Sequence, residues 1–331
     1  MARFVLLQDN NILMKNSGLS SSVLKKKLVL LYFLTVLYKY FCYYVIKVIN
    51  SVFYQEDFMS TTTEKKNRPL ILKNDVMNAL KTVGVKKGQN IIVHCSLSSI
   101  GFVCGGPQII IESLLESVGA EGTILMPTQS WKNLDPETGV HWEEPVEWWN
   151  AIRENWPAYN KYITPTNTMG AVAEMFRTCP GTMRSDHPAR SFAANGRNAR
   201  LFTNNHDLSN IFGDGSPLGR LYDEDGNILL IGVGYDKNTS LHLADARADF
   251  KSKHNTVEHS AIMENGVRVW KAYETLAVDG EDFDAIGEAF ESSAENAGFI
   301  HKTTLGNATL RFIKMRPLVD FAVKWIEANR K

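Results

Sequence analysis

A histidine that follows a glycine-rich turn is the residue of this chain best placed to do chemistry. The stretch from Asn227 to Asp245 reads NILLIGVGYDKNTSLHLAD, in which an apolar run predicts a buried strand and the two glycines predict a turn after it. Polar residues beyond the turn can cap a helix, so we expect His242 in the first turn of that helix. The free N–H groups and positive end of a helix disfavour imidazolium. We therefore predict that His242 acts as a neutral general base; the competing interpretation is a histidine that only packs.

A second stretch that could bind a ligand or take part in catalysis runs from Asn90 to Gly106 and reads NIIVHCSLSSIGFVCGG. A predicted strand ends at His94, and the small hydroxyl residues and glycines after it could present N–H and hydroxyl groups to a phosphate. The stretch lacks the lysine and glycine spacing of nucleotide-binding loops, which disfavours nucleotide hydrolysis and dinucleotide binding. Cys95 and His94 would point to opposite faces of a strand, so they cannot readily act as nucleophile and base. The plain alternative is an ordinary loop between a strand and a helix.

A third candidate is the loop sequence RSDHP, in which Asp186 stands beside His187. Loops on rigid scaffolds often carry binding and catalytic residues, so both are candidate catalytic residues. The alternative is a local turn that leaves His187 exposed.

The segment 131–149 combines tryptophans with acidic residues: it contains five Asp or Glu residues and one Lys or Arg residue, Lys132. Aromatic faces and carboxylates suit a cationic, hydroxylated ligand such as a polyamine or an aminosugar. The alternative is a solvated acidic loop packed by its tryptophans. The candidate substrate-binding residues are Asp135, Glu143, Glu144 and Glu147.

The elements that must position these residues alternate between helix and strand. Helical spacing at 73–83 is followed by an apolar strand at 90–94, a helix at 107–118 that begins near Pro107, and a strand at 123–126. This alternation predicts a single large α/β domain, with a mostly parallel central sheet flanked by helices and an elaborated loop region at 130–163. Further expected elements are helices at 171–177, 283–296 and 319–329, strands at 191–194 and 267–273, and a loop at 180–188.

Composition excludes several classes of protein. The 331 residues carry 36 Lys and Arg against 36 Asp and Glu, so the overall charge offers no argument for a nucleic-acid partner. The four cysteines form no CxxC pair, which argues against a disulfide framework or a structural zinc site. We expect a protein of the reducing cytoplasm.

The first 58 residues differ from the rest, since seven Lys and Arg stand there against three acids. The apolar run 28–49 is almost long enough to span a bilayer, but it contains Lys39 and Lys47. We favour a misassigned start, with Met59 opening the regular domain at 59–331; a membrane anchor and a disordered or regulatory arm are the alternatives.

From about Leu70 to Ala328 the chain resembles the aminoglycoside 3-N-acetyltransferase family. The resemblance rests on VHCSLSSIGFVCGGP, EGTILMPTQSW, GAVAEMFR, RSDHPARSF, GDGSPLGRLY and LLIGVGYDKNTSLHLAD, which are specific when taken together. It implies transfer of an acetyl group from acetyl-CoA to the 3-amino group of a deoxystreptamine antibiotic, without a metal. The phosphate loop R/Q-x-x-G-x-G/A of the other common N-acetyltransferase fold is absent from the sequence.

The resemblance also implies roles for residues. His242 corresponds to the catalytic histidine, and Glu274 in VWKAYETL to a carboxylate that orients it. The usual H-L-A-E of the family ends here in Asp245, which we keep as a lesser candidate for that role. The implied coenzyme cradle comprises His94, Ser96, Leu97, Ser98, Ser99, Gly105, Gly106, Asn238, Thr239 and Ser240.

The implied reaction needs a base, because a protonated amine cannot attack a thioester, and it needs donors for the oxyanion that forms. Three alternatives remain open. The chain could acetylate a different amine, or transfer an acyl group covalently through a serine or Cys95, although no G-x-S-x-G elbow supports that route. It could also bind CoA or an aminosugar with little catalysis.

Overall fold

A computed structural model describes residues 68–139 and 141–330 of the chain. Residues from Pro69 onward form one compact unit. The segment 1–58, its three interpretations and the expected domain start at Met59 lie outside the described residues. No helix in the described part of the chain is both long and apolar enough to cross a bilayer.

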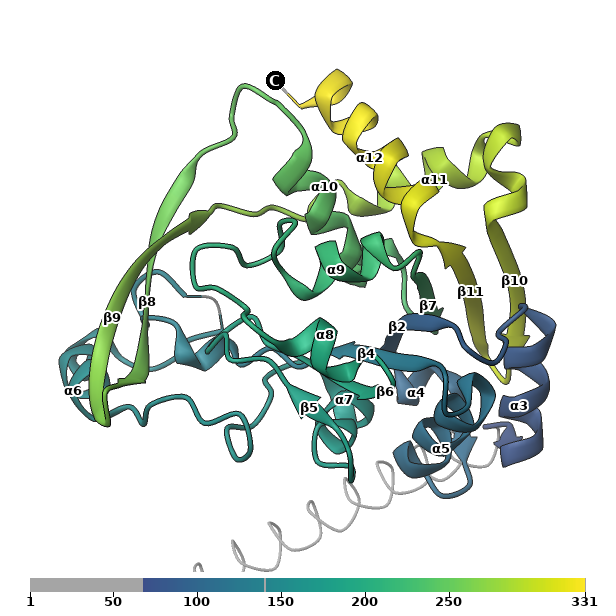
Figure 1. Cartoon of the computed structure of the whole chain (residues 1–331), viewed down its shortest axis with the longest axis horizontal. Helices are drawn as coiled ribbons and strands as arrows, with labels where there is room; N and C mark the ends of the chain where they lie inside the picture. The colour runs from purple at the N-terminus through teal and green to yellow at the C-terminus, as the bar shows by residue number, and fades with distance from the viewer. Residues whose placement is uncertain (1–67, 140, 331) are drawn as a thin grey trace, which may run out of the picture. The chain divides into compact units, whose positions relative to one another are not determined.

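A seven-stranded sheet forms the centre of this unit (Figure 1). Its three middle strands run parallel to one another, and all the remaining neighbours pair antiparallel. The predicted α/β class and single domain are confirmed, and the sheet is mixed, with its parallel part confined to the middle. One reason is that Gly306 and Asn307 alone join the last two strands, which is too short for a parallel crossover. The strand order is β10 (Ile300–Leu305), β11 (Ala308–Lys314), β7 (Asn227–Ile231), β2 (Asn90–Cys95), β4 (Thr123–Pro127), β6 (Phe192–Gly196) and β5 (Met183–Arg184).

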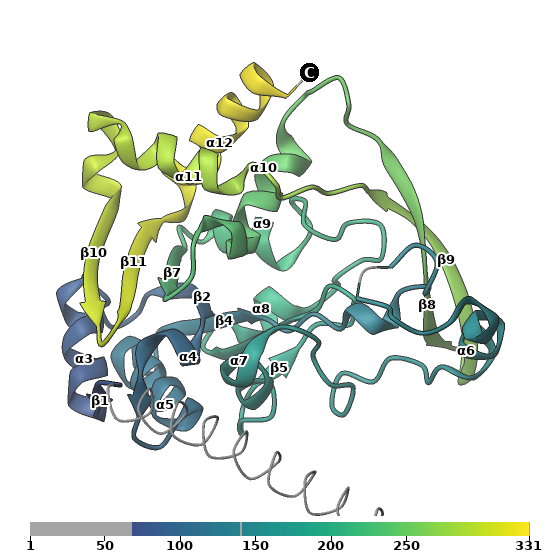
Figure 2. The same ribbon diagram turned by 180° about the vertical axis from the view of Figure 1, so that it is seen from behind.

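The middle strands are buried on both faces because alternate side chains enter two separate cores. Ile91 and Val93 of β2 join one apolar cluster, whereas Ile92 between them joins the other. Helices cover both faces, as the two views show (Figures 1 and 2). The first face is covered by α3 (Lys73–Thr82), α5 (Pro107–Val118) and α7 (Gly170–Phe176); the second by α8 (Ala199–Thr203), α9 (Pro217–Asp223), α10 (His242–Arg247), α11 (Phe283–Ser292) and α12 (Met315–Asn329).

The elaborated region packs against a hairpin that stands apart from the central sheet (Figure 1). The hairpin consists of β8 (Asn255–Glu264) and β9 (Val267–Leu276), of which the sequence predicted only the second strand. The backbone N–H of Asp135 donates to the carbonyl of His259 at 3.1 Å, and that of Tyr159 to the carbonyl of Ala261 at 2.9 Å. Within the region lie two 3₁₀ turns, η1 (Trp131–Asn133) and η2 (Val146–Trp148), and the helix α6 (Trp149–Asn155).

A buried arginine joins the start of this region to the sheet. Arg184 of β5 is 5 % exposed, and its guanidinium donates to the carbonyls of Thr128 and Thr164, each at 2.5 Å. It also donates to the hydroxyls of Ser130 and Ser191, at 2.9 and 3.0 Å. One side chain of β5 therefore satisfies acceptors from the chain leaving β4, from the residue before β6 and from the loop near Thr164.

We predict that Arg184→Met lowers the free energy of unfolding by about 3–5 kcal/mol, because it leaves several buried acceptors without donors. The matched control is Arg197→Met, which removes an exposed ion pair with Glu121 and should cost within about 0.5 kcal/mol. Urea denaturation of both variants measures the difference. Equal losses would contradict the role given to Arg184.

Candidate active site

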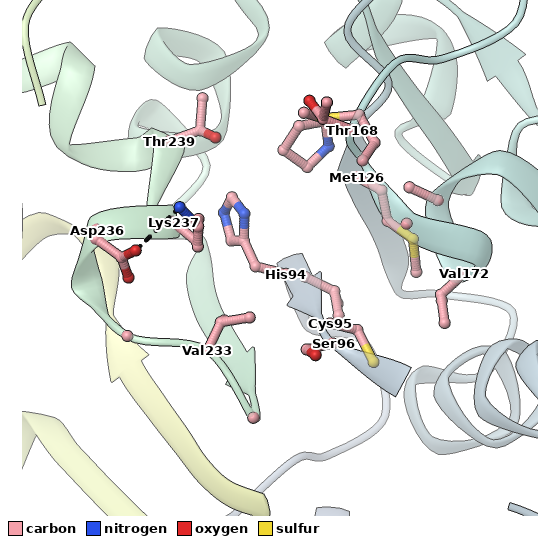
Figure 3. A pocket seen from close by; sticks show the side chains of 17 residues that line it. His94, Cys95, Ser96, Met126, Thr168, Val172, Val233, Asp236, Lys237 and Thr239 are labelled. Atoms are coloured by element: carbon pink, nitrogen blue, oxygen red, sulfur yellow. Dashed lines mark ion pairs between the residues drawn. The ribbon is translucent and has the colours of Figure 1, made fainter. Parts of the chain in front are cut away.

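A cavity of about 500 Å³ opens at the carboxyl ends of the three parallel strands. His94 and Cys95 come from β2, Met126 from β4, and Gly232 from the turn after β7. Figure 3 shows His94 between the loop that carries Lys237 and Thr239 and the opposite wall with Met126 and Thr168. Ligands of α/β proteins bind in this position because the loops that leave parallel strands meet at one edge of the sheet.

The glycine turn predicted from the sequence forms one wall of the cavity. Gly232 has φ +63°, and a Cβ there would lie 2.1 Å from the hydroxyl oxygen of Ser99. That hydroxyl lies within hydrogen-bond distance of the carbonyls of Gly232 (2.9 Å) and Ser96 (2.8 Å). The turn therefore needs glycine, and its backbone can approach a ligand without an intervening side chain.

His242 is the first residue of α10 and follows one turn after Thr239, which lines the cavity. Its Nδ1 lies 2.8 Å from Oδ2 of Asp245, a carboxylate that is 1 % exposed. The ring stacks on Phe212, with 4.7 Å between centroids and 8° between planes, and it meets Phe283 in an edge-to-face arrangement with 4.8 Å between centroids. An ionised carboxylate only accepts hydrogen bonds, so Nδ1 carries the proton and the lone pair lies on Nε2. Nε2 has no hydrogen-bond partner among the described residues.

Glu274 does not contact His242, so the structure corrects the predicted pairing. Tyr273 and Thr275 are buried, and the alternation along β9 turns the side chain of Glu274 outward. Its carboxylate accepts from Nδ2 of Asn255 at 2.8 Å and lines a second cavity of about 450 Å³. Asp245 replaces it because positions i and i+3 of a helix share one face.

Only three of the ten expected coenzyme-binding residues, His94, Ser96 and Thr239, line the main cavity. Residues 97–99 lie instead in the short helix α4 (Leu97–Ile100). Beyond it, β3 (Phe102–Val103) pairs with β1 (Leu70–Ile71), and Gly105 and Gly106 then turn into α5 outside the cavity lining. Asn238 and Ser240 are fully buried, and the Asn238 side chain accepts the N–H of Ser240.

Sequence reasoning missed other residues of the cavity wall. Lys237 and Gly234 lie in the quoted glycine stretch, where a cation and an exposed backbone beside a predicted strand could have been noted. Thr168 and Met169 precede α7 and Gly170 begins it, and nothing local indicates that this loop returns to the strand ends.

Burial determines the protonation of the two adjacent residues at the end of β2. It lowers the pKa of His94 to about 3, so that imidazole is neutral at physiological pH. It raises the pKa of the Cys95 thiol to about 12, which keeps the sulfur protonated and argues against a thiolate nucleophile.

Asp186 and His187 do not form the catalytic pair that their adjacency predicted. Asp186 is exposed and pairs with Lys161 at 3.0 Å. His187 is fully buried, and its Nδ1 accepts the N–H groups of Ala189 and Arg190 at 3.2 and 3.0 Å. Burial lowers the pKa of His187 well below its usual value, so it is neutral and structural in this arrangement.

Two of the four acids expected to bind substrate are already paired. Asp135 accepts two hydrogen bonds from Arg153, at 2.7 and 2.9 Å, and Glu144 pairs with Lys132 at 2.7 Å. These pairs hold the elaborated region together and leave those carboxylates less able to bind a ligand. Glu143 and Glu147 are exposed and carry no ion pair within the part of the chain that is described.

Residues 92–327 match the family model described as aminoglycoside 3-N-acetyltransferase. A similar protein is the SPbeta prophage-derived aminoglycoside N(3')-acetyltransferase-like protein YokD of Bacillus subtilis, 41 % identical over 78 % of this chain and 93 % of its own length. The aminoglycoside N(3)-acetyltransferase IX of Micromonospora chalcea is 34 % identical over 79 % of this chain and 95 % of its own.

Solved structures share the fold. The crystal structure of YokD superimposes with a TM-score of 0.74 at 40 % identity, covering 79 % of this chain and 94 % of that chain. The structure of AAC-IIIb as a binary complex with CoASH gives a TM-score of 0.69 at 26 % identity, covering 79 % of this chain and 98 % of that chain.

Three buried histidines predict a decrease in stability on mild acidification. Burial lowers the pKa of His94 to about 3 and of His206 to about 4, and that of His187 further below its usual value. In the unfolded chain each takes up a proton near pH 6.5, so the unfolded state binds more protons below that pH.

The free energy of unfolding should therefore change little with pH above 6.5 and fall by about 3 kcal/mol in total between pH 6.5 and 5.5. Urea denaturation across this range tests the effect. His187→Asn should reduce the dependence by about a third. A pH-independent free energy over this range would refute the assignment.

Proposed function

The chain belongs to the aminoglycoside 3-N-acetyltransferase family, and from that premise we propose that it transfers the acetyl group of acetyl-CoA to the 3-amino group of an aminoglycoside, with His242 as the general base. Membership makes the chain an acyltransferase. The observation that carries the proposal is the buried carboxylate of Asp245 on Nδ1 of His242, which leaves Nε2 without a protein partner among the described residues.

In the proposed step, the electron pair of the neutral amine forms the bond to the thioester carbonyl carbon while Nε2 of His242 takes one proton from that nitrogen. An amine that arrives as an ammonium ion first gives its extra proton to solvent. The carbon–sulfur bond breaks as the tetrahedral intermediate collapses, and the imidazolium returns its proton to the departing sulfur. Asp245 holds the ring orientation and stabilises the imidazolium while it exists.

The cavity at the strand ends is the proposed coenzyme site. Nε2 of His94 is buried at its wall and has no hydrogen-bond partner within 68–139 and 141–330, which suits a polar group of a bound ligand. The backbone at Gly232 and Gly234 is accessible. Lys237 pairs with Asp236 at 3.0 Å, but both side chains are exposed, so this ion pair can exchange and the ammonium can attract a phosphate. The structure of AAC-IIIb, a structural relative, is a binary complex with CoASH.

The amine substrate is proposed to bind through exposed carboxylates. Glu274 lines the second cavity together with Phe212, the residue on which His242 stacks. Its carboxylate can pair with an ammonium group, as can those of Glu143 and Glu147. Acidic residues at these places suit aminoglycosides and other polyamines alike.

A thiol-release assay with acetyl-CoA, a panel of deoxystreptamine aminoglycosides and simple polyamines tests the proposal. We expect CoA release with aminoglycosides and a product acetylated at the 3-amino group by NMR. Release only with other amines would reject the aminoglycoside. Binding of CoA without release in any mixture would indicate a binding protein, and a trapped acyl-enzyme would indicate the covalent route.

We predict that His242→Gln lowers kcat by about 10²–10⁴-fold, because the attacking amine loses its base. Asp245→Asn should lower kcat by about 10²-fold or more, because the imidazole loses its fixed tautomer. Neither change should alter KM for acetyl-CoA by more than about twofold. An unchanged kcat for His242→Gln would reject the assignment; the exposed His301→Gln is the control.

Glu274→Gln separates two roles for that residue. As an ammonium-binding group, its loss should raise KM for the amine by about tenfold and leave kcat within about twofold. If Glu274 instead oriented His242, kcat would fall as far as in Asp245→Asn. Steady-state kinetics at saturating acetyl-CoA distinguish the two outcomes.

A further inference from the structure

Arg330, which follows α12, contacts the carboxylate that holds His242. Its Nη1 donates to Oδ1 of Asp245 at 2.7 Å, while His242 occupies Oδ2 at 2.8 Å. Asp245 is 1 % exposed, and an ionised carboxylate removed from water requires a nearby cation or several donors. Among the described residues, Arg330 and His242 are its salt-bridge partners.

Asp282 holds the guanidinium of Arg330 in one plane. Nε and Nη2 donate to the two carboxylate oxygens of Asp282, both at 2.7 Å, which is the bidentate arrangement that orients an arginine best. Nη2 also donates to the carbonyl of Asp279 at 3.3 Å, and the guanidinium lies over the ring of Phe250, 5.2 Å from its centroid. These contacts leave Nη1 directed at Asp245.

The segment that holds Arg330 also contacts the imidazole itself. The edge of Phe283 meets the ring of His242, and a Cβ on Gly280 would lie 3.8 Å from its Cε1. Arg330 and His242 are therefore both fixed by residues 279–283, which places the guanidinium, the carboxylate and the imidazole in one contiguous set of contacts.

We infer that Arg330 is a positioning residue for the catalytic base: held by Asp282, it fixes the Asp245 carboxylate and thereby the orientation and proton of His242. This inference rests on the proposed function, in which His242 is the base. Without the guanidinium, the buried carboxylate loses a partner and either turns toward water or attracts a proton onto the imidazole. Both changes reduce the population of neutral imidazole with a free Nε2.

Other charged groups near α10 are already engaged elsewhere. Arg247 pairs with Asp214, and Lys253 donates to the carbonyls of Ala246 and Ala248. On α12, Glu327 accepts the N–H of Asp249. With Arg330 removed, the net charge near His242 becomes more negative, so imidazolium should persist to higher pH.

The test compares Arg330→Met with a matched control, Arg316→Met. Arg316 lies at the other end of α12 and donates to the carbonyls of Tyr222 and Asp223. Its guanidinium carbon lies over the ring of Tyr222, 5.3 Å from the centroid, and the side chain has no contact with Asp245. For Arg330→Met we expect kcat to fall about 10–100-fold, KM for acetyl-CoA to stay within about twofold, and the acid limb of the kcat profile to move about one pH unit higher.

A double variant shows whether the effect passes through the carboxylate. Adding Arg330→Met to Asp245→Asn should lower kcat no further than Asp245→Asn alone. The inference is overturned if the losses multiply, or if Arg330→Met keeps the kcat and pH profile of Arg316→Met. Should Arg330→Met fail to fold, Asp282→Asn replaces it, with an expected loss of several-fold in kcat.

An NMR titration separates this inference from the proposed function. The ring protons of His242, assigned by their loss in His242→Gln, should titrate about one pH unit higher in Arg330→Met than in the unsubstituted protein. If no acetyl transfer occurs but this shift is seen, the proposed function fails and the positioning role stands. If acetyl transfer occurs and the titration is unchanged, the positioning role fails.

Discussion

The arrangement of the active site depends on three strands that are buried on both faces and run in parallel. Parallel strands must be joined by crossovers, so β2, β4 and β7 all end at one edge of the sheet, with their following loops side by side. That constraint brings His94, Met126 and Gly232 around one cavity although they are far apart in the sequence. The antiparallel hairpins at the two edges extend the sheet without disturbing this centre.

A second constraint is that buried charges must be paired, and the described chain meets it at several places that join distant segments. Arg190 pairs with Glu258 at 2.6 Å and lies over the ring of Trp131, which connects the hairpin, the elaborated region and the approach to β6. The ion pair between Arg330 and Asp245 likewise connects the end of α12 to α10. Because breaking one such pair leaves a charge uncompensated, these contacts specify geometry more than they add stability.

Much of the fold could be predicted from the sequence because its signals are local. The helices at 73–83 and 107–118 and the strands at 90–94 and 123–126 have strong periodicity, and the structure confirms them. The strand β8 and the last hairpin were missed, because half-exposed strands give weak patterns that depend on their partners. The expected upstream segment at 1–58 lies outside the described residues.

The sequence by itself determined the α/β class, the glycine turn after Ile231 and the position of His242 in the first turn of a helix, since each depends on neighbours a few residues away. It also contained the spacing that pairs His242 with Asp245 on one helical face. Only the tertiary structure decided that Glu274 faces outward and that Asp135 is already bound to Arg153. It also decided that Asp186 is exposed on the surface while His187 beside it is buried. It alone brought Arg330 to the same carboxylate from 85 residues further along. Contacts of that separation are set by how whole helices and strands pack, and no local pattern encodes them.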